Sequence, residues 1–317
     1  MPKRNTAISI IRVMSMIIIV AYHCMCYNAG IWARYSCNNV NENIAVVAKI
    51  FVSIALPMFF FISGYVYSLN IHEGKYKNGF AFVYKKYSRL IVPTIFFTII
   101  YCMLFPRDYR FMEIISGVGH LWFLPTLFIC FLLTYSLNSI FLNNRRIMGG
   151  AFLMLVCILS CYSDMFVNIN IQYAVCKYLV FFVFGVFIYP INSLMKLNKK
   201  LLILLILLSF VGHFINMWQE SKMSSLVDIF CLCILMLSIL GLITQMKVKE
   251  SPVLCFLDKN SLKIYLIHQP LIMLLYEYSS FEELYLTPHP YRFIPILFIV
   301  VLLVSVSLSM GMARLRL

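Results

Sequence analysis

Charged residues are scarce in this chain. Of its 317 residues, only 12% are Asp, Glu, Lys or Arg, whereas 62% are hydrophobic. Soluble globular proteins average about 25% charged and about 45–50% apolar residues, so the composition excludes an ordinary soluble fold. A membrane span takes about 20 apolar residues, so about ten spans would leave roughly 117 residues for tails and connections. We predict an all-α, polytopic membrane protein with a single membrane-embedded domain over residues 1–317 and no appended soluble domain.

Acidic residues are the scarcer of the two charged classes. The chain has 12 Asp+Glu against 26 Lys+Arg, which gives a formal net charge of +14. In a soluble protein this charge would suggest a nucleic-acid partner, but no basic tail or basic-aromatic module is present. Cytoplasmic loops of membrane proteins collect Lys and Arg. We therefore predict no nucleic-acid partner and assign the positive charge to cytoplasmic loops; membrane lipids are among the partners expected of the chain.

Motifs for metal and phosphate chemistry are missing as well. The 11 cysteines form no CxxC pair and no Cys/His metal spacing, so those inside apolar runs are predicted to be small packing residues. Cys24, Cys26 and Cys37 lie near one membrane face, which leaves a disulfide bridge among them open. The sequence has no phosphate-cradling glycine loop and no GxSxG elbow. Neither a metal site nor a permanently bound cofactor is predicted.

About ten apolar segments are separated by charged or Gly/Pro/Asn-containing stretches. The first segment carries Arg12 in its first turns and lacks a small-x-small cleavage site, so it is not predicted to be a removable signal peptide. A backbone inside lipid must satisfy its own hydrogen bonds, and each segment is therefore predicted to be a helix. The segments are 8–28, 44–69, 88–105, 121–141, 149–165, 173–190, 200–217, 226–246, 262–279 and 293–313.

Lysine and arginine are distributed unequally between alternate loops. The set that includes both termini and loops 70–90, 142–148, 191–200 and 247–263 holds eighteen, and the opposite set holds five. Because positive charge collects on the cytoplasmic side, both termini are predicted to be cytoplasmic. The eighteen are Lys3, Arg4, Lys75, Lys77, Lys85, Lys86, Arg89, Arg145, Arg146, Lys196, Lys199, Lys200, Lys247, Lys249, Lys259, Lys263, Arg314 and Arg316; the five are Arg34, Arg107, Arg110, Lys222 and Arg292.

Two ionisable residues occur inside the first segment, where such side chains are costly and are candidates for function. Arg12 and His23 are eleven residues apart. At about 100° per residue they lie roughly 20° from the same helix face, separated by about 16 Å along the axis. Each residue alone could be interfacial, Arg12 by extending its side chain to the membrane surface. The shared face favours a functional pair.

His120 opens the fourth segment in the run GHLWFLP, which begins at Gly119. An imidazole beside Trp122 is compatible with an aromatic belt at the membrane surface. The predicted orientation places His120 and His23 toward the same outer side. The two imidazoles could therefore share general-base work, because an imidazole titrates near neutral pH.

The second segment ends in FFFISGY, which contains Ser63 and Tyr65. Its Ser-Gly step is typical of close helix packing, and this interpretation is favoured because a serine nucleophile needs an adjacent base. Arg89 begins the third segment, next to Lys85 and Lys86. This basic group could bind phosphates or anchor the helix at the cytoplasmic side.

Two histidines lie in the C-terminal half of the segment series. His268 lies in the run YLIHQP, in the predicted cytoplasmic half of the ninth segment, where Pro270 is expected to kink the helix. His213 has no ionisable neighbour in the sequence and is predicted to be a packed polar residue. Among the acids, Asp228 and Glu277 are predicted to be nearest to buried.

In this order these landmarks resemble the acyltransferase-3 family of bacterial integral-membrane acyltransferases, of the O-antigen acetylase type. The resemblance covers nearly the whole chain. It rests on Arg12-x10-His23, FFISGY from Phe60 to Tyr65, the stretch from Arg89 to Pro93, HLWFL from His120, and YLIH from Tyr265 to His268.

The resemblance implies an O-acyltransferase that moves an acyl group, often acetyl from acetyl-CoA, onto a surface glycan such as lipopolysaccharide or a lipid-linked O-antigen precursor. Acetyl-CoA would be a co-substrate, and the location would be the bacterial cytoplasmic (inner) membrane. The family's Arg-x10-His hallmark falls on Arg12 and His23. The expected substrate-binding residues are Trp122, Ser63, Tyr65 and His268.

For this chemistry we expect His23 to act as the general base, with Arg12 and His120 as further catalytic candidates. Coenzyme A is anionic, so its phosphates are expected to contact basic side chains. The candidates are Arg12, Arg89, Lys85 and Lys86. A covalent acyl-histidine relay is an open variant of the mechanism. The alternative function is a polysaccharide or small-solute exporter, in which the polar residues would line a pathway.

Overall fold

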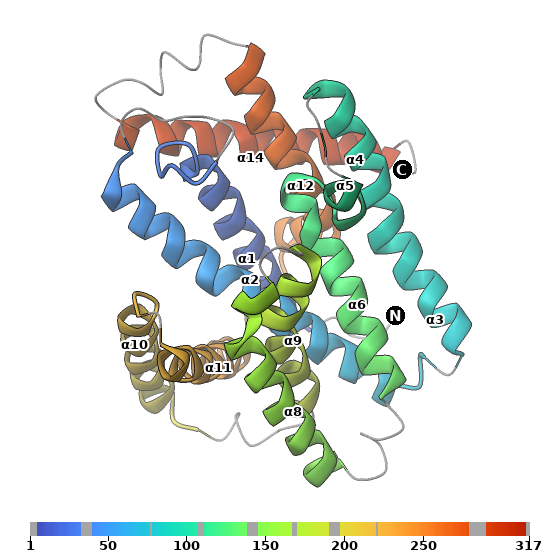
Figure 1. The fold of residues 1–317 in the computed structure, drawn as a ribbon, viewed down its shortest axis with the longest axis vertical. Helices are drawn as coiled ribbons and strands as arrows, with labels where there is room; N and C mark the ends of the chain where they lie inside the picture. The colour runs from blue at the N-terminus through green and yellow to red at the C-terminus, as the bar shows by residue number, and fades with distance from the viewer. Residues whose placement is uncertain are drawn as a thin grey trace. The chain divides into compact units, whose positions relative to one another are not determined.

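The structure is a computed structural model. It describes residues 5–32, 40–76, 78–106, 109, 111–137, 145–166, 170–189, 197–219, 221–246, 248–278 and 290–314. These residues form helices, turns and short connections, with no β-strand among them, which confirms the predicted all-α class (Figure 1). Within them, eight helical stretches are long and apolar enough to cross a membrane. They are Thr6–Met25, Glu42–His72, Gly79–Leu104, Gly119–Ser136, Ile171–Ile188, Lys199–Asn216, Lys222–Gln245 and Pro290–Met312.

The fifth and ninth predicted segments correspond to two helices outside that set of eight. Helix α8 (Arg145–Cys161) has a shorter apolar stretch, and helix α12 (Pro252–Tyr278) is long but more polar. The prediction of a loop over 247–263 is wrong, because α12 begins at Pro252. The polar residues of its first turns are typical of a connection, yet Asp258, Asn260 and Ser261 are buried.

The chain divides into two compact units. The first unit comprises residues 1–56 and 249–317; the second comprises residues 57–248. The boundary falls inside helix α2 (Glu42–His72), at Pro57. Proline has no N–H, so Pro57 cannot donate the helical hydrogen bond to the carbonyl of Ser53. The long helix thus changes units at the point where its own hydrogen-bond ladder is interrupted.

The first unit is built from both ends of the chain. Helix α1 (Thr6–Met25) packs against α12 and against α14 (Pro290–Arg314), and α12 packs against α14. Asn5 caps α1 by accepting a 3.1 Å hydrogen bond from the backbone N–H of Ala7. This packing of the first and last parts of the sequence brings together polar residues of α1 and α12.

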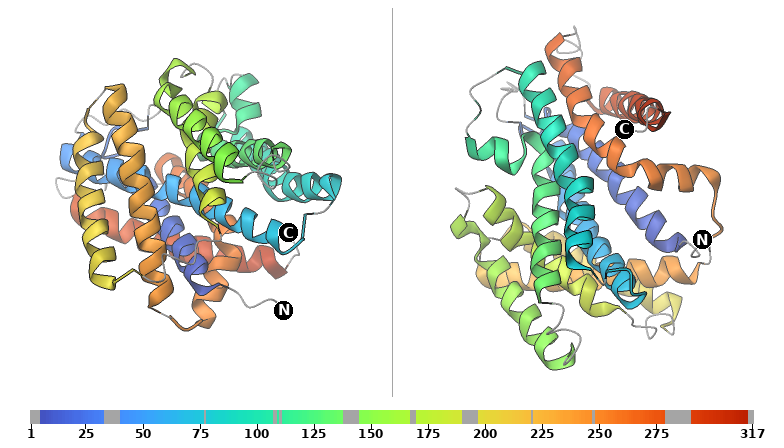
Figure 2. Two further views of the ribbon diagram at one scale, coloured as in Figure 1. Left: turned by 90° about the horizontal axis from the view of Figure 1, so that it is seen from below. Right: turned by 90° about the vertical axis from the view of Figure 1, so that its right-hand side faces the viewer.

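The second unit contains the remaining helices of the residues that the structure describes. They are the C-terminal half of α2, α3 (Gly79–Lys86), α4 (Val92–Leu104), α5 (Phe111–Ser116), α6 (Phe123–Ser136), α8, α9 (Asn170–Ile188), α10 (Lys199–Asn216) and α11 (Lys222–Gln245). A hairpin of two tightly packed helices, α10 and α11, is clear in Figure 2, and α8 and α6 both pack against α9.

Two glycines allow α2 and α9 to cross with their backbones in contact. A Cβ atom added at Gly64 would overlap the carbonyl oxygen of Phe182, and one added at Gly185 would overlap the carbonyl oxygen of Phe61. Each glycine therefore faces the backbone of the other helix. This is the close packing expected at the Ser-Gly step of the second segment.

Three side-chain contacts between segment ends agree with the predicted alternation of loops. The Tyr291 hydroxyl donates to Asn41 at 3.1 Å, and the Lys222 ammonium donates to Asp164 at 3.1 Å. Gln245 donates to the backbone carbonyl of Leu197 at 2.9 Å. Each contact joins two ends that the alternation places on one side of the membrane.

The cysteines near the end of α1 carry free thiols. Cys24 and Cys26 are both buried and free. Cys37, the third residue of the possible bridge, lies outside the described residues.

Candidate active site

Polar side chains of α1 and α12 meet at two levels along the first unit. At one level Arg12 lies 2.6 Å from Asp258; at the other His23 lies 3.0 Å from His268. From the first level to the second, the residue numbers rise on both α1 and α12, so the two helices run in the same direction. The spacing is eleven residues on α1 and ten on α12, or about 16 Å and about 15 Å of helix. The shared face predicted for Arg12 and His23 is thus the face that contacts α12.

The level of Arg12 and Asp258 is an ion pair with a third, neutral partner. The Arg12 guanidinium donates through Nη1 to Asp258 Oδ1 at 2.6 Å, and the Ser9 hydroxyl donates to Asp258 Oδ2 at 2.8 Å. The Asp258 side chain is 2% exposed, whereas the Arg12 side chain is 27% exposed. A buried carboxylate needs such partners, because burial without them costs several kcal/mol. Asp258 therefore holds the Arg12 side chain in place while about a quarter of that side chain, 27%, stays accessible.

The level of His23 and His268 is a pair of buried imidazoles. His23 Nδ1 lies 3.0 Å from His268 Nε2 and 3.0 Å from the carbonyl oxygen of Ile19. His268 Nδ1 lies 2.6 Å from the carbonyl oxygen of Tyr265. A carbonyl can only accept, so His268 carries its proton on Nδ1 and its Nε2 accepts from His23 Nδ1–H. For neutral rings this assignment leaves the lone pair of His23 on Nε2.

The pairing corrects the predicted position of His268. The sequence placed it in the cytoplasmic half of a segment that began at 262. Helix α12 begins at Pro252, so His268 lies sixteen residues into its helix, as His23 lies seventeen residues into α1. His268 is therefore at the level of His23, and its side chain is buried.

Asp258 is a residue of this site that the sequence patterns do not predict. It falls in the predicted basic cytoplasmic loop 247–263, together with Lys259 and Lys263. The available signal was its distance from His268, which nearly matches the distance from Arg12 to His23. An acid and a base at matching spacings on two helices predict two paired levels, but only once both segments are known to be helical.

His120 lies in the second unit, in the short turn Gly119–Trp122 that precedes α6. Its side chain is buried, and its Nδ1 lies 3.1 Å from the Tyr101 hydroxyl. Tyr101 itself belongs to α4 and is buried. The contact attaches the turn to α4, so a holding role explains this histidine within its own unit.

Trp122 contributes to a stack of aromatic rings in the second unit. Its ring lies 5.7 Å from that of Tyr178, and Tyr178 stacks on Phe60 at 5.0 Å with an interplanar angle of 7°. Further along α2, the Tyr65 ring packs edge-on against Tyr189 at 5.3 Å. Ser63 is only partly buried and precedes the glycine that contacts α9.

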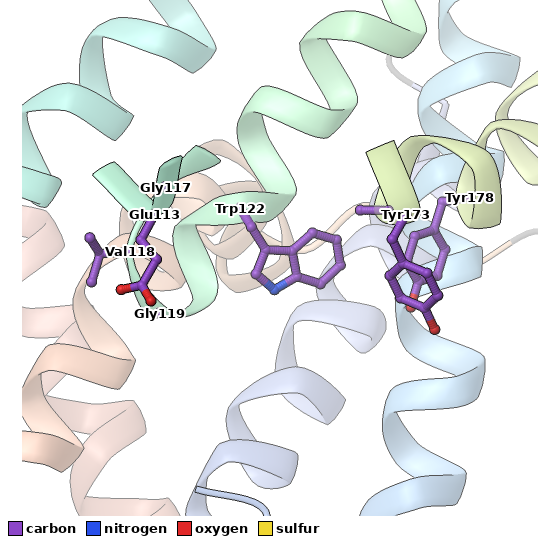
Figure 3. Close-up of a pocket in the computed structure, with 8 residues that line it drawn as sticks. Glu113, Gly117, Val118, Gly119, Trp122, Tyr173 and Tyr178 are labelled. Carbon is purple, nitrogen blue, oxygen red and sulfur yellow. The ribbon is translucent and has the colours of Figure 1, made fainter. Parts of the chain in front are cut away.

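A cavity of about 430 Å³ opens beside Trp122. Figure 3 shows the indole between the Glu113 carboxylate and the rings of Tyr173 and Tyr178. The lining residues are Glu113, Gly117, Val118, Gly119, Trp122, Tyr173, Ala174 and Tyr178. Of the candidates named from the sequence, only Trp122 lines it.

Arg89 lies in a widened helical turn, Tyr87–Ile91, between α3 and α4. The turn has a local cause, because Pro93 cannot donate to the carbonyl of Arg89 four residues earlier. The backbone N–H of Val92 instead reaches the carbonyl of Tyr87, five residues back. Such π-turns recur at functional sites. The Arg89 side chain is exposed.

The two neighbouring lysines differ in their surroundings. Lys85 is exposed, whereas the Lys86 ammonium lies 3.5 Å from the centre of the Phe131 ring, a cation–π contact. Burial raises the pKa of the nearby Tyr76 phenol, and the positive charge of Arg89 opposes that shift. Arg89 and Lys85 therefore present the more accessible positive charge of the three.

His213 has a partner that the sequence did not reveal. Its Nδ1 lies 2.6 Å from Asp228 Oδ1, across the α10–α11 hairpin. The expectation of a histidine without an ionisable partner is wrong. The two residues are only fifteen positions apart, but the turn between their helices brings them together. Across the ranges that the structure describes, no group of three or more His, Cys, Asp or Glu could hold a metal ion.

Comparison with known proteins gives one match. A family model described as an acyltransferase domain, that of the acyltransferase-3 family, matches residues 5–310. The match includes both levels of the α1–α12 contact. No curated protein and no solved structure matches the chain.

Proposed function

This chain belongs to the acyltransferase-3 family of membrane acyltransferases, and from that premise we propose that it transfers an acetyl group from acetyl-CoA to a hydroxyl of a cell-surface glycan. A lipid-linked precursor, such as an O-antigen unit, is the acceptor we favour. The observation that carries the proposal is the contact of His23 with His268, which orients one imidazole for base catalysis.

His23 is the general base of this mechanism. Its Nε2 lone pair takes the proton of the acceptor hydroxyl while the hydroxyl oxygen attacks the thioester carbonyl. The new C–O bond forms, the C–S bond then breaks, and the imidazolium returns the proton to the departing sulfur of coenzyme A. Positive charge that develops on the His23 ring is shared with the lone pair of His268 through Nδ1–H. His268 is therefore a positioning residue.

Arg12 serves the donor in this proposal. The guanidinium has five N–H donors, so its bond to Asp258 through Nη1 leaves donors for the anionic part of acetyl-CoA. Asp258 and Ser9 fix the direction of the side chain. Arg89 and Lys85 are further candidate contacts for phosphates, because both are exposed and positively charged.

The proposal also assigns sides and a compartment. The eighteen-to-five distribution of Lys and Arg supports cytoplasmic termini. In a bacterial cytoplasmic (inner) membrane, acetyl-CoA would then be supplied on the side of Arg12, and the acceptor would be modified on the side of His23. The thioester would reach His23 through the long pantetheine arm, which suits the roughly 16 Å between the two levels.

Mass spectrometry of surface glycans tests this function. Cells that lack the chain should lose one acetyl unit per acylated repeat, and the wild-type chain should restore it. His23→Ala should not restore it, whereas the matched control His72→Ala should, because His72 is exposed at the end of α2. Normal acetylation in the deletion strain, with glycan retained inside the cell, would refute acyl transfer and favour export.

A further inference from the structure

The cavity beside Trp122 has the chemistry of a carbohydrate site. We propose that it is the subsite that holds a pyranose ring of the acceptor, an inference that rests on the proposed transfer to a sugar hydroxyl. Its volume of about 430 Å³ lies within the range of roughly 300–1,000 Å³ typical of small-molecule pockets. A mono- or disaccharide unit fits a space of this size.

The aromatic wall provides a rigid surface for the apolar face of a sugar. The Trp122 and Tyr178 rings are stacked, with their centres 5.7 Å apart and an interplanar angle of 25°, and Tyr178 in turn stacks on Phe60. Tyr178 is 9% exposed, so most of its side chain is packed against other parts of the protein. Large aromatic side chains combine apolar area with a polar edge. A ring supported in this way loses little conformational freedom when a ligand packs on it.

The polar atoms of the cavity suit hydroxyl groups. The Glu113 carboxylate accepts hydrogen bonds, and the Trp122 indole N–H donates one. In Figure 3 these atoms and the phenol oxygens of Tyr173 and Tyr178 point toward the same side of the cavity. The Lys177 ammonium donates to the Tyr173 oxygen at 2.8 Å, which directs the phenol proton toward another acceptor. Donors and acceptors thus alternate beside an aromatic surface.

A turn with two glycines, Gly117 and Gly119, also lines the cavity. Gly117 and Gly119 have φ angles of 92° and 59°, in the region that side chains other than glycine rarely adopt. A Cβ atom at Gly117 would lie 2.7 Å from the backbone of Leu121. The turn is tied to α4 through His120 and Tyr101. This part of the lining is therefore bare backbone held in a fixed shape, which a ligand can approach closely.

Two other ligands fit this cavity less well. Phosphates of coenzyme A would be repelled by the Glu113 carboxylate, and an acyl chain would press apolar surface against that carboxylate and the Trp122 indole N–H, which is costly. The predicted loop alternation also places Glu113 and Tyr173 on the outer side, away from the cytoplasmic donor. The acceptor sugar is the occupant that matches both the charge and the side.

Binding of simple glycosides to the full-length protein tests the subsite. The protein would be placed in lipid nanodiscs, because maltoside detergents are themselves glycosides. Saturation-transfer NMR would be recorded with methyl pyranosides of glucose, galactose, mannose, rhamnose and N-acetylglucosamine. We expect transfer to the ring C–H protons of at least one glycoside. Trp122→Ala should weaken that binding about tenfold or more, and Glu113→Ala about tenfold, the effect of a lost hydrogen bond to a charged group.

Trp218→Phe is the matched control, because Trp218 is exposed beyond the end of α10 and does not line the cavity. Its signal should equal that of the wild type. No transfer to any glycoside, or equal transfer with Trp122→Ala, would overturn the subsite. The assay contains no acetyl-CoA, so its outcome is separate from the proposed reaction. Glycoside binding without acetylation in cells would refute the reaction and keep the subsite.

Discussion

His23 Nδ1 and His268 Nε2 lie 3.0 Å apart although 245 residues separate them in the chain. The contact fixes the orientation of the His23 ring, and the carbonyl of Tyr265 fixes that of His268. A histidine that is held through one nitrogen can present the other to a substrate. The arrangement therefore gives the two residues unequal roles, which mutagenesis can separate.

Replacing the two histidines should give different losses. General-base catalysis contributes about 10²–10⁴-fold, so His23→Ala should reduce turnover by that amount. His268→Ala should have a smaller effect, because the base remains but loses its partner. His268→Gln should recover part of the loss, since its amide oxygen can accept from His23 Nδ1–H. Rates would be measured with protein present at equal levels; equal activity of the Ala and Gln variants would contradict the positioning role.

The pair of Arg12 and Asp258 should be coupled in stability. Removing one partner of a buried pair leaves an uncompensated charge and costs about 3–5 kcal/mol, whereas removing both costs less. Asp258→Leu should therefore lower the thermal midpoint more than the double variant Arg12→Met/Asp258→Leu. Neither variant should be active if Arg12 contacts the donor. Additive effects on the midpoint would show that the two side chains act independently.

The crossing of α2 and α9 should not tolerate larger residues. Gly64→Ala and Gly185→Ala would each place a methyl group on a backbone carbonyl, and overpacking typically costs about 1–3 kcal/mol. Gly150→Ala on α8 is the matched control, because no atom lies within 4 Å of its added Cβ. That change should be neutral or stabilising by about 0.5–1 kcal/mol. Thermal melting in detergent would measure all three, and unchanged melting of Gly64→Ala would refute the contact.

Arg89 should affect the donor more than the acceptor. Arg89→Ala should raise the KM for acetyl-CoA and leave the KM for the glycan nearly unchanged, because the loss is an electrostatic contact to phosphate. Arg89→Lys should raise the KM for acetyl-CoA less than Arg89→Ala does, because lysine keeps the positive charge. A lower turnover with unchanged saturation by acetyl-CoA would identify Arg89 as a membrane anchor instead.

Cysteine labelling should follow the alternation of loops. In intact cells an impermeant maleimide should label Lys222→Cys but not Lys200→Cys, after subtraction of the wild-type signal. Loops around Asn38 and Glu283 should likewise be outside, and those around Lys77 and Arg145 inside. The eighteen-to-five distribution of positive charge is the reason. Labelling of Lys77→Cys in intact cells would show that the predicted topology is wrong.

Local patterns in the sequence were sufficient for most helices and for one face of the site. Apolar length predicted the spans, and helical periodicity placed Arg12 and His23 on one face. The start of α12 was missed because its buried polar residues resemble a loop. The contacts of His268 with His23 and of His213 with Asp228 could not be predicted, since each depends on how separate helices pack. Periodicity along one helix carries no information about its neighbour.

The parallel direction of α1 and α12 also bears on the number of spans. Two parallel spans need an odd number of crossings between them. Among the residues that the structure describes, the apolar helices between α1 and α12 number six without α8 and seven with it. At 17 residues α8 is about 25 Å long, near the lower limit for a span. The α1–α12 pairing thus agrees with the ten predicted segments, and with both termini on one side.

Because the first unit is made from the two ends of the chain, it is completed late in synthesis. Arg12 precedes Asp258 by 246 positions, so at about 5–20 residues per second its counter-charge is made roughly 12–50 s afterwards. Every described helix of the second unit is synthesised during that interval. Until then the partly synthesised chain contains the guanidinium of Arg12 and the imidazole of His23 without their final partners. A chain stalled before Pro252 would contain all of the second unit but only half of the histidine pair.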